Sequence, residues 1–175
     1  MIIIPVSTRR LFPVCVIILV IFFLCVYYMN LLYQVGYFGP IILFISTGCL
    51  MFYMTKSLGH SFELFMGFYI FSMVLNHVVK QLLKQPRPRG GKTINKFDKV
   101  DLDRYGMPSG HANSVAFSLI FSILYFRDIF ISLIFALIAF LTVTQRLVYK
   151  KHSLKQIGCG AIIGGLLAII CYYSL

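Results

Sequence analysis

The sequence predicts an all-α fold: a polytopic membrane protein with a six-transmembrane-helix bundle, in a single domain over residues 1–175. Of the 175 residues, 59% are hydrophobic and 12% are charged. The mean hydropathy is +0.88, well above that of a soluble domain. Apolar runs approach the roughly 20 residues that a helix needs to cross a hydrocarbon core. Because a bilayer leaves no water for unpaired backbone groups, such runs must be helical.

Each expected helix is an apolar run that ends at charged, glycine or proline residues. The six runs are Leu11–Val35, Pro40–Thr55, Ser61–Leu83, Ser109–Phe126, Ile129–Tyr149 and Leu154–Leu175. The second run is the weakest. Short connections at residues 36–39, 56–60, 127–128 and 150–153 make successive helices antiparallel neighbours, and only the loop over residues 84–108 is long. Four glycines of the last run, at positions 158, 160, 164 and 165, have the spacing that lets helices pack closely.

The positive charge is concentrated at two places. The chain has 16 Lys and Arg against five acidic residues, a net charge of +11, and 12 of the 16 lie within residues 80–104 and 146–155. With six helices, the connections after the third and the fifth emerge on the same membrane face, so the two clusters meet. Alone, such a surface fits anionic lipid headgroups, a topology signal or nucleic acid, and nucleic acid is the weakest because no recognised binding fold accompanies it.

The first cluster begins at the end of the third expected helix. Lys80 is still within the helix, and Arg87 follows seven positions later in KQLLKQPRP. Pro86 and Pro88 cannot continue a helix, so the chain must leave it between Lys80 and Arg87 and turn along the membrane surface. The two cations therefore lie near one another at the interface.

The start of the fourth expected helix has the composition of an anion site. In PSGH, Pro108 closes the long loop and Ser109 stands in an N-cap position. Gly110 and His111 fall in the first turn. The free amides of a helix N-terminus, a hydroxyl and a glycine that permits close approach favour a bound anion.

The third group of polar residues joins the last two expected helices. Arg146 lies at the end of the fifth, and His152 lies at the start of the sixth, with Gln156 one turn further on the same face. Three cations, free amides and two histidines on one membrane face are what phosphoryl transfer requires. Asp98, Asp101 and Asp103 alternate with basic residues, as in a solvated loop, so the chemistry is expected to need no metal and no cofactor.

These residues resemble the type-2 phosphatidic acid phosphatase superfamily of membrane lipid phosphatases. Its motifs are Lys-x6-Arg-Pro, Pro-Ser-Gly-His and Ser-Arg-x5-His-x3-Asp. The matching residues here are Lys80, Arg87 and Pro88, then Pro108, Ser109, Gly110 and His111, then Arg146 and His152. Gln145 stands where the family has Ser, and Gln156 where it has Asp. The segments QPRPRGG and YGMPSGH and the spacing His-x3-Gln are similar to the dolichyl-diphosphatase branch, over about residues 76–167.

The resemblance implies hydrolysis of a polyprenyl diphosphate, such as dolichyl diphosphate, to the monophosphate and phosphate. It implies carrier recycling for N-glycosylation, in the endoplasmic reticulum membrane. His152 would be the nucleophile that forms a phosphohistidine, and His111 the general acid and then base. Gln156 would accept a hydrogen bond from the other ring nitrogen of His152. The residues expected to hold the phosphoryl oxygens are Lys80, Arg87, Ser109, Gly110 and Arg146. The expected partners are the lipid phosphate and membrane lipids, without nucleic acid.

Other functions remain open at this point. A phosphatase for phosphatidic acid or another lipid monophosphate would share every motif. The missing Asp also suits a pseudoenzyme that only binds lipid phosphates. A channel or scaffold with a basic face would not need two histidines at these places. The positive-inside rule puts the basic face in the cytoplasm, whereas the resemblance implies the lumenal face, so the sequence leaves sidedness open.

Overall fold

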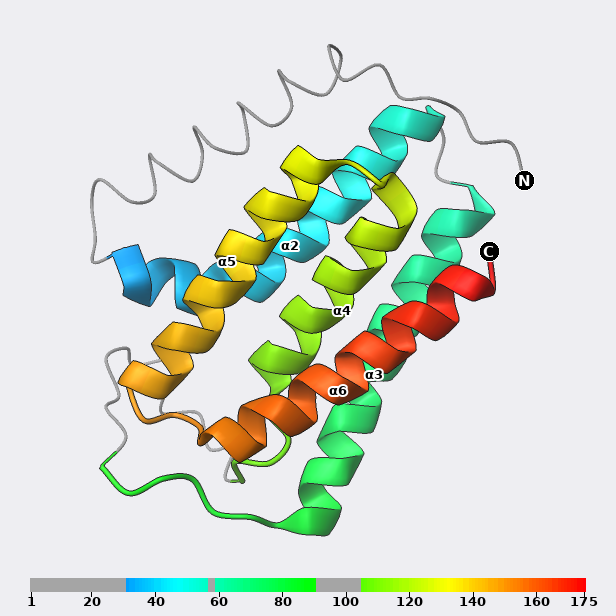
Figure 1. Cartoon of the computed structure of the whole chain (residues 1–175). Coiled ribbons are helices and arrows are strands. Elements are labelled where there is room, and N and C mark those ends of the chain that lie inside the picture. Colours follow the sequence, from blue (N-terminus) through cyan, green and yellow to red (C-terminus); the bar gives the residue numbers. More distant parts are fainter. Residues whose placement is uncertain (1–30, 57–58, 91–104) are drawn as a thin grey trace.

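The computed structural model describes residues 31–56, 59–90 and 105–175, and these form a bundle of α-helices (Figure 1). The helices are α2 (Leu31–Thr55), α3 (His60–Leu83), α4 (Gly110–Phe126), α5 (Ile129–Val148) and α6 (Leu154–Tyr173). The all-helical prediction is confirmed for this part of the chain. Most of the first expected helix falls on residues 11–30, outside the described residues, so the count of six is not confirmed.

The lengths of the helices match a membrane environment. Four of them, α2, α3, α5 and α6, are long and apolar enough to cross a membrane, while α4 has 17 residues and is shorter. The bounds of α3, α4, α5 and α6 lie within one or two residues of the last four apolar runs. The match follows from local signals: Ser109, Asp128 and Ser153 each accept a hydrogen bond from the first turn of the helix that they precede.

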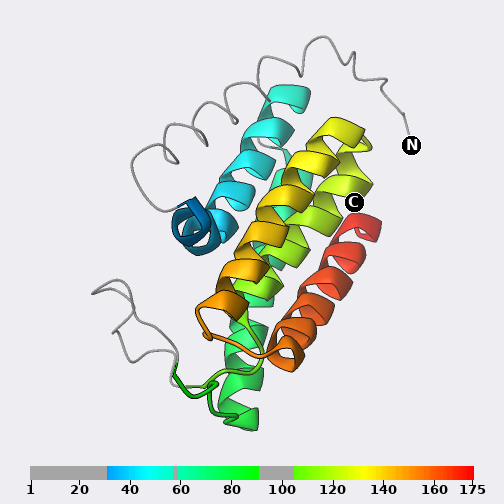
Figure 2. The same cartoon turned by 60° about the vertical axis from the view of Figure 1, so that its left-hand side comes forward.

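The connection expected at residues 36–39 is wrong, because α2 continues through it from Leu31 to Thr55. Pro40 lies inside this helix. A proline offers no N–H to the carbonyl one turn earlier, and its ring crowds that turn, so a helix bends there without having to end. Figures 1 and 2 show the first turns of α2, in blue, running in a different direction from the rest of the helix. The glycine and proline residues therefore mark a bend.

Helix α4 is the centre of the bundle, since it contacts α2, α3, α5 and α6. Its approach to α6 depends on two glycines. A Cβ atom at Gly160 would collide with the backbone of Ser109, and one at Gly164 would collide with the backbone of Asn113. The close packing predicted from the glycine spacing is confirmed at these two positions. It brings the start of α6 beside the start of α4.

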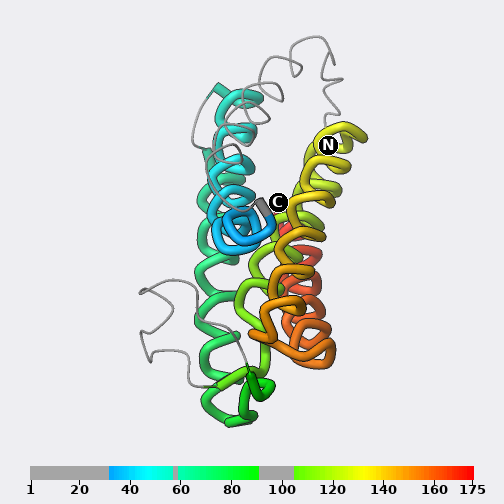
Figure 3. Tube along the Cα trace, turned by 90° about the vertical axis from the view of Figure 1, so that its left-hand side faces the viewer, coloured from blue at the N-terminus to red at the C-terminus, as the bar shows by residue number. Residues whose placement is uncertain are grey.

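Three helix ends meet at one end of the bundle. Figure 3 shows the end of α3, the start of α4 and the connection from α5 to α6 gathered at its lower end. Among the described residues, the two carboxylates are Glu63, in the first turn of α3, and Asp128, before α5. Both are at the opposite end of their helices from Lys80 and Arg146. The end that carries the motif residues is therefore strongly basic within the described part of the chain.

Candidate active site

The end of α3 delivers one buried cation and one half-buried cation. Lys80 is buried in the last turn of the helix. The helix is closed by Lys84 in a left-handed conformation, whose N–H donates to the Lys80 carbonyl at 3.1 Å. The chain then crosses the end of the bundle (Figure 1), and Arg87 Nη1 donates to the Lys151 carbonyl at 3.3 Å. The exit predicted from the two prolines is confirmed, and it joins the first motif to the third.

The start of α4 forms as predicted, with Ser109 as its N-cap. Ser109 is fully buried, and its Oγ accepts from Ala112 N at 3.4 Å. Its own main-chain N–H is already engaged, because it donates to the Gln156 carbonyl at 3.0 Å. The first N–H groups of an α-helix have no partner within the helix. The amides that this terminus offers to an anion therefore belong to Gly110 and His111.

His111 contacts both α5 and α2. Its Nε2 atom is hydrogen-bonded to Arg146 Nη2 and lies 3.3 Å from the Tyr37 carbonyl oxygen. The Tyr37 ring lies 6.2 Å from the His111 ring and 6.0 Å from the Arg146 guanidinium, measured to the ring centroid. Tyr37 is a site residue that the motif pattern missed. The one signal in the sequence was Pro40, three residues after Tyr37, because a proline inside a helix marks a bend.

His152 is buried immediately before α6, and the main chain orients its ring. Its Nδ1 atom lies 2.8 Å from the Gly106 carbonyl oxygen. A carbonyl only accepts, so Nδ1 carries the proton, and in the neutral ring the lone pair is on Nε2. The expected hydrogen bond between His152 and Gln156 is therefore wrong. Gly106 takes that position, and the sequence marked it only as a glycine before the Pro-Ser-Gly-His motif.

Gln156 is buried and makes different contacts. Its Oε1 accepts from the Ser153 N–H at 3.1 Å, which completes a capping box at the start of α6. Its Nε2 donates to Gln85 Oε1 at 3.1 Å and to the Pro86 carbonyl at 2.9 Å. The side chain thus joins α6 to the segment that carries Arg87.

Burial and nearby cations keep the His152 ring neutral. The pKa of His152 is lowered to about 3, first because burial disfavours the charged ring and then because the Arg87 guanidinium is near. The bond to the Gly106 carbonyl acts in the other direction. A neutral ring with an unprotonated Nε2 is the form that can attack phosphorus.

This lowered pKa predicts a pH-dependent stability. Above about pH 6.5 the ring is neutral in both the folded and the unfolded chain and contributes nothing. At lower pH the unfolded chain binds a proton that the folded chain does not, so the free energy of unfolding should fall by about 1.4 kcal/mol per pH unit toward pH 4. We expect thermal unfolding in detergent to show a smaller acid loss for His152→Gln than for the wild type. Equal losses would mean that His152 is protonated in the folded protein.

Gln145, which departs from the family pattern, lies in the packing between α5 and α2. It is fully buried, and a Cβ atom at Gly36 would collide with its side chain. Within the described residues its amide nitrogen and oxygen have no hydrogen-bond partner. Thr142, one turn earlier, occupies the corresponding place against Gly39. The glycines of α2 thus make room for side chains of α5.

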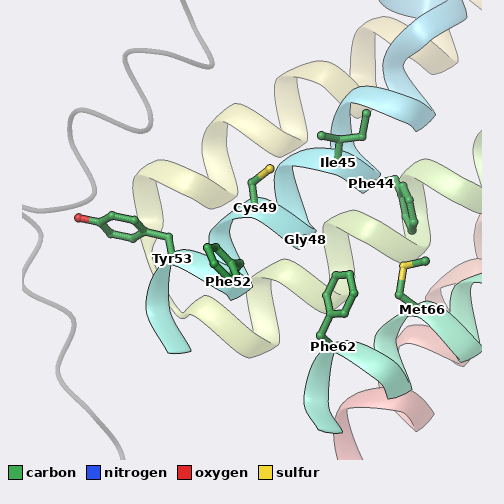
Figure 4. Close-up of a pocket in the computed structure, with 8 residues that line it drawn as sticks. All are labelled: Phe44, Ile45, Gly48, Cys49, Phe52, Tyr53, Phe62 and Met66. Carbon is green, nitrogen blue, oxygen red and sulfur yellow. The ribbon is translucent and has the colours of Figure 1, made fainter. Parts of the chain in front are cut away.

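A separate apolar pocket of about 540 Å³ lies between α2 and α3 (Figure 4). Its lining residues are Phe44, Ile45, Gly48, Cys49, Phe52, Tyr53, Phe62 and Met66. Lys80 is fourteen residues beyond Met66 along α3, about 21 Å at the helical rise. The pocket contains none of the motif residues and is distinct from the basic end.

Comparison with known proteins gives one matching family and several relatives. The model of the PAP2 superfamily matches residues 63–175. Human dolichyldiphosphatase 1 is 30% identical over 121 residues, which are 60% of this chain and 49% of that protein. Human sphingosine-1-phosphate phosphatase 2 is 30% identical over 110 residues, 59% of this chain and 27% of that protein.

A plant relative and a solved structure extend the comparison. Lipid phosphate phosphatase epsilon 1, chloroplastic, of Arabidopsis thaliana is 28% identical over 77% of this chain and 44% of that protein. The chain therefore spans less than half of the length of each of these three relatives. The crystal structure of a transmembrane PAP2 type phosphatidylglycerolphosphate phosphatase from Bacillus subtilis superimposes with a TM-score of 0.64 at 17% identity, covering 91% of this chain and 94% of that one. The bundle thus has a transmembrane fold already known from a solved structure.

Proposed function

Because the chain belongs to the PAP2 superfamily, we propose that it is a membrane lipid phosphatase that hydrolyses a polyprenyl diphosphate of the dolichyl type. The observation that carries this proposal is the convergence of two buried cations, Lys80 and Arg146, with His152 and the start of α4 at one basic end of the bundle. Cations, free main-chain amides and a histidine gathered at one place are the groups that phosphoryl transfer requires. This set of groups supports an anionic phosphate as the substrate.

In the proposed first step, Nε2 of His152 attacks the terminal phosphorus and forms a phosphorus–nitrogen bond. The bond from phosphorus to the bridging oxygen breaks, and the polyprenyl monophosphate leaves after His111 protonates that oxygen. Water then attacks the phosphohistidine, His111 takes its proton, and inorganic phosphate is released. The Arg146 donor and the Tyr37 acceptor at His111 Nε2 favour opposite protonation states, which suits a group that gives up a proton and regains one.

The remaining motif residues would hold the phosphoryl oxygens. Arg87 is held near His152 by its bond to the Lys151 carbonyl, and a guanidinium can bind phosphoryl oxygens in a bidentate manner. Lys80 and Arg146 supply charge, and Gly110 supplies a main-chain amide at the positive end of α4. The hydroxyl of Ser109 accepts from Ala112, so its own proton is available to an oxygen of the phosphoryl group.

A lipid monophosphate is the second candidate substrate. A sphingosine-1-phosphate phosphatase and a lipid phosphate phosphatase match this chain at about the same identity as dolichyldiphosphatase 1. The resemblance in QPRPRGG, YGMPSGH and His-x3-Gln favours the diphosphate. The same resemblance supports our proposal that the protein is in the endoplasmic reticulum membrane.

The test is phosphate release by the full chain in detergent, with excess chelator, from a polyprenyl diphosphate and from phosphatidic acid. We expect chelator-resistant release with a higher kcat/KM for the diphosphate. A higher kcat/KM for phosphatidic acid would replace the proposed substrate class. Release that needs a divalent metal would contradict the phosphohistidine mechanism. Binding of both lipids without release would identify a pseudoenzyme.

A further inference from the structure

Two glutamine side chains meet where three segments of the active site come together. We propose that Gln85 and Gln156 are positioning residues: together they hold the Arg87 segment and Gly106 against the start of α6, and so set the orientation of His152. This role deepens the proposed phosphatase function and rests on it. Neither glutamine needs to touch the substrate.

Gln156 contacts each of the three segments through a different group. The side-chain Nε2 donates to Gln85 Oε1 at 3.1 Å and to the Pro86 carbonyl at 2.9 Å, both directly before Arg87. The main-chain carbonyl accepts from the Ser109 N–H at 3.0 Å, at the start of α4. The side-chain Oε1 accepts from the Ser153 N–H, next to His152. The buried side-chain amide thus joins the Arg87 segment to the start of α6, and the main-chain carbonyl joins the start of α4 to the same helix.

Gly106 is placed by the same pair. Its N–H donates to the Gln85 carbonyl at 2.7 Å, and its carbonyl accepts from His152 Nδ1 at 2.8 Å. A Cβ atom at this glycine would lie 2.6 Å to 2.8 Å from atoms of the Gln156 side-chain amide, so the two residues are in close contact. Gln85 and Gln156 therefore determine where the Gly106 carbonyl lies, and that carbonyl determines the tautomer and direction of the His152 ring.

The two sides of the Gln156 amide have separable roles. The oxygen side caps α6, and a glutamate serves equally well in a capping box and carries a charge that suits a helix N-terminus. The nitrogen side bonds to two oxygens. A carboxylate cannot donate to these oxygens and would repel them at the same distance. Gln156→Glu therefore keeps the cap and removes the link to residues 85 and 86.

The matched variant is Ser153→Ala, which removes the capping hydroxyl but leaves the link between Gln156 and Gln85. Both variants are made in the full chain and purified in detergent. The measurements are kcat and KM for phosphate release, and the midpoint of thermal unfolding. We expect Gln156→Glu to lower kcat by about 10- to 100-fold, since a small misplacement of the reacting groups has an effect of this size, with a fall in the midpoint no larger than that of Ser153→Ala. Ser153→Ala should lower the midpoint and keep kcat within about two-fold of wild type, because a cap acts on stability.

Wild-type kcat and KM in Gln156→Glu would overturn the positioning role. A loss of kcat that comes with a larger fall in the midpoint than in Ser153→Ala would also overturn it, because that pattern belongs to a residue with a purely structural role. If Gln156→Glu does not fold, Gln156→Met replaces it: this side chain has similar length and no donor, and we expect the same loss of kcat. An inactive wild type would instead overturn the proposed function, and with it this role.

Discussion

His152→Ala is expected to abolish turnover, with a loss on the order of 10³-fold or more, because it removes the atom proposed to form the covalent intermediate. The neutral ring, the proton on Nδ1 and the hydrogen bond to Gly106 all prepare Nε2 for attack. Of the two histidines at the site, His152 bonds through Nδ1 to a main-chain carbonyl, whereas His111 bonds through Nε2. The measurement is phosphate release from a polyprenyl diphosphate in chelator, with trapping of a phosphorylated protein in the wild type.

The control for this variant is His60→Ala. His60 is exposed at the start of α3, at the opposite end of that helix from Lys80, so its removal should leave turnover unchanged. The variants should also be compared by thermal unfolding, since both lose a ring of the same size. Retained turnover in His152→Ala would contradict the nucleophile assignment. A phosphorylated intermediate that survives the substitution would do the same.

Arg87→Lys is expected to lower kcat by about 10²-fold although the charge is kept. The guanidinium donates one N–H to the Lys151 carbonyl at 3.3 Å, and a guanidinium is a rigid planar fork that suits phosphoryl oxygens. An ammonium on a flexible stem cannot bridge a carbonyl and two phosphoryl oxygens in a fixed plane. The loss should be of the size seen when one donor to a transition-state oxygen is removed. Steady-state kinetics in detergent provide the measurement.

The Arg87→Lys variant separates geometry from charge. A positive group remains near His152, so the electrostatic contribution that keeps this ring neutral is largely preserved. Arg89→Lys, two residues later at an exposed position, is the matched control and should behave as wild type. Near-normal turnover in Arg87→Lys would show that Arg87 contributes charge alone, without a directional contact to the phosphoryl group.

The sequence by itself determined the helices and the chemical types at their ends. The apolar runs fixed α3 to α6 to within a few residues, because helix length in a membrane depends on hydrophobic content and because Ser109, Asp128 and Ser153 act locally as caps. The exit of the chain after Lys80 followed from two prolines. The meeting of Lys80, Arg146 and His152 at one end followed from helix order, since consecutive helices run in opposite directions, whereas their burial is a result of the tertiary structure.

The sequence misled at residues 36–39, where a bend has the same composition as a loop. Gly36 and Gly39 indicate a turn when the chain is considered alone. In the bundle, they are the places where Gln145 and Thr142 of α5 pack against α2. That packing favours a continuous helix over a break. It depends on side chains of α5, so the sequence of residues 36–39 considered alone does not show it. The same contact brings Tyr37 to His111.

Only the tertiary structure decided how the His152 ring is oriented. The partner of His152 is a main-chain carbonyl 46 positions away, and one partner of His111 is a carbonyl 74 positions away. Every residue has a main-chain carbonyl, so the type of side chain does not show which carbonyl accepts a hydrogen bond from a histidine. Gln156 matched a motif position and was therefore expected to bond to His152, yet its amide nitrogen bonds to Gln85 and Pro86, and the His152 ring bonds to Gly106. The motif named the residues at the site, while long-range packing set which of their atoms meet.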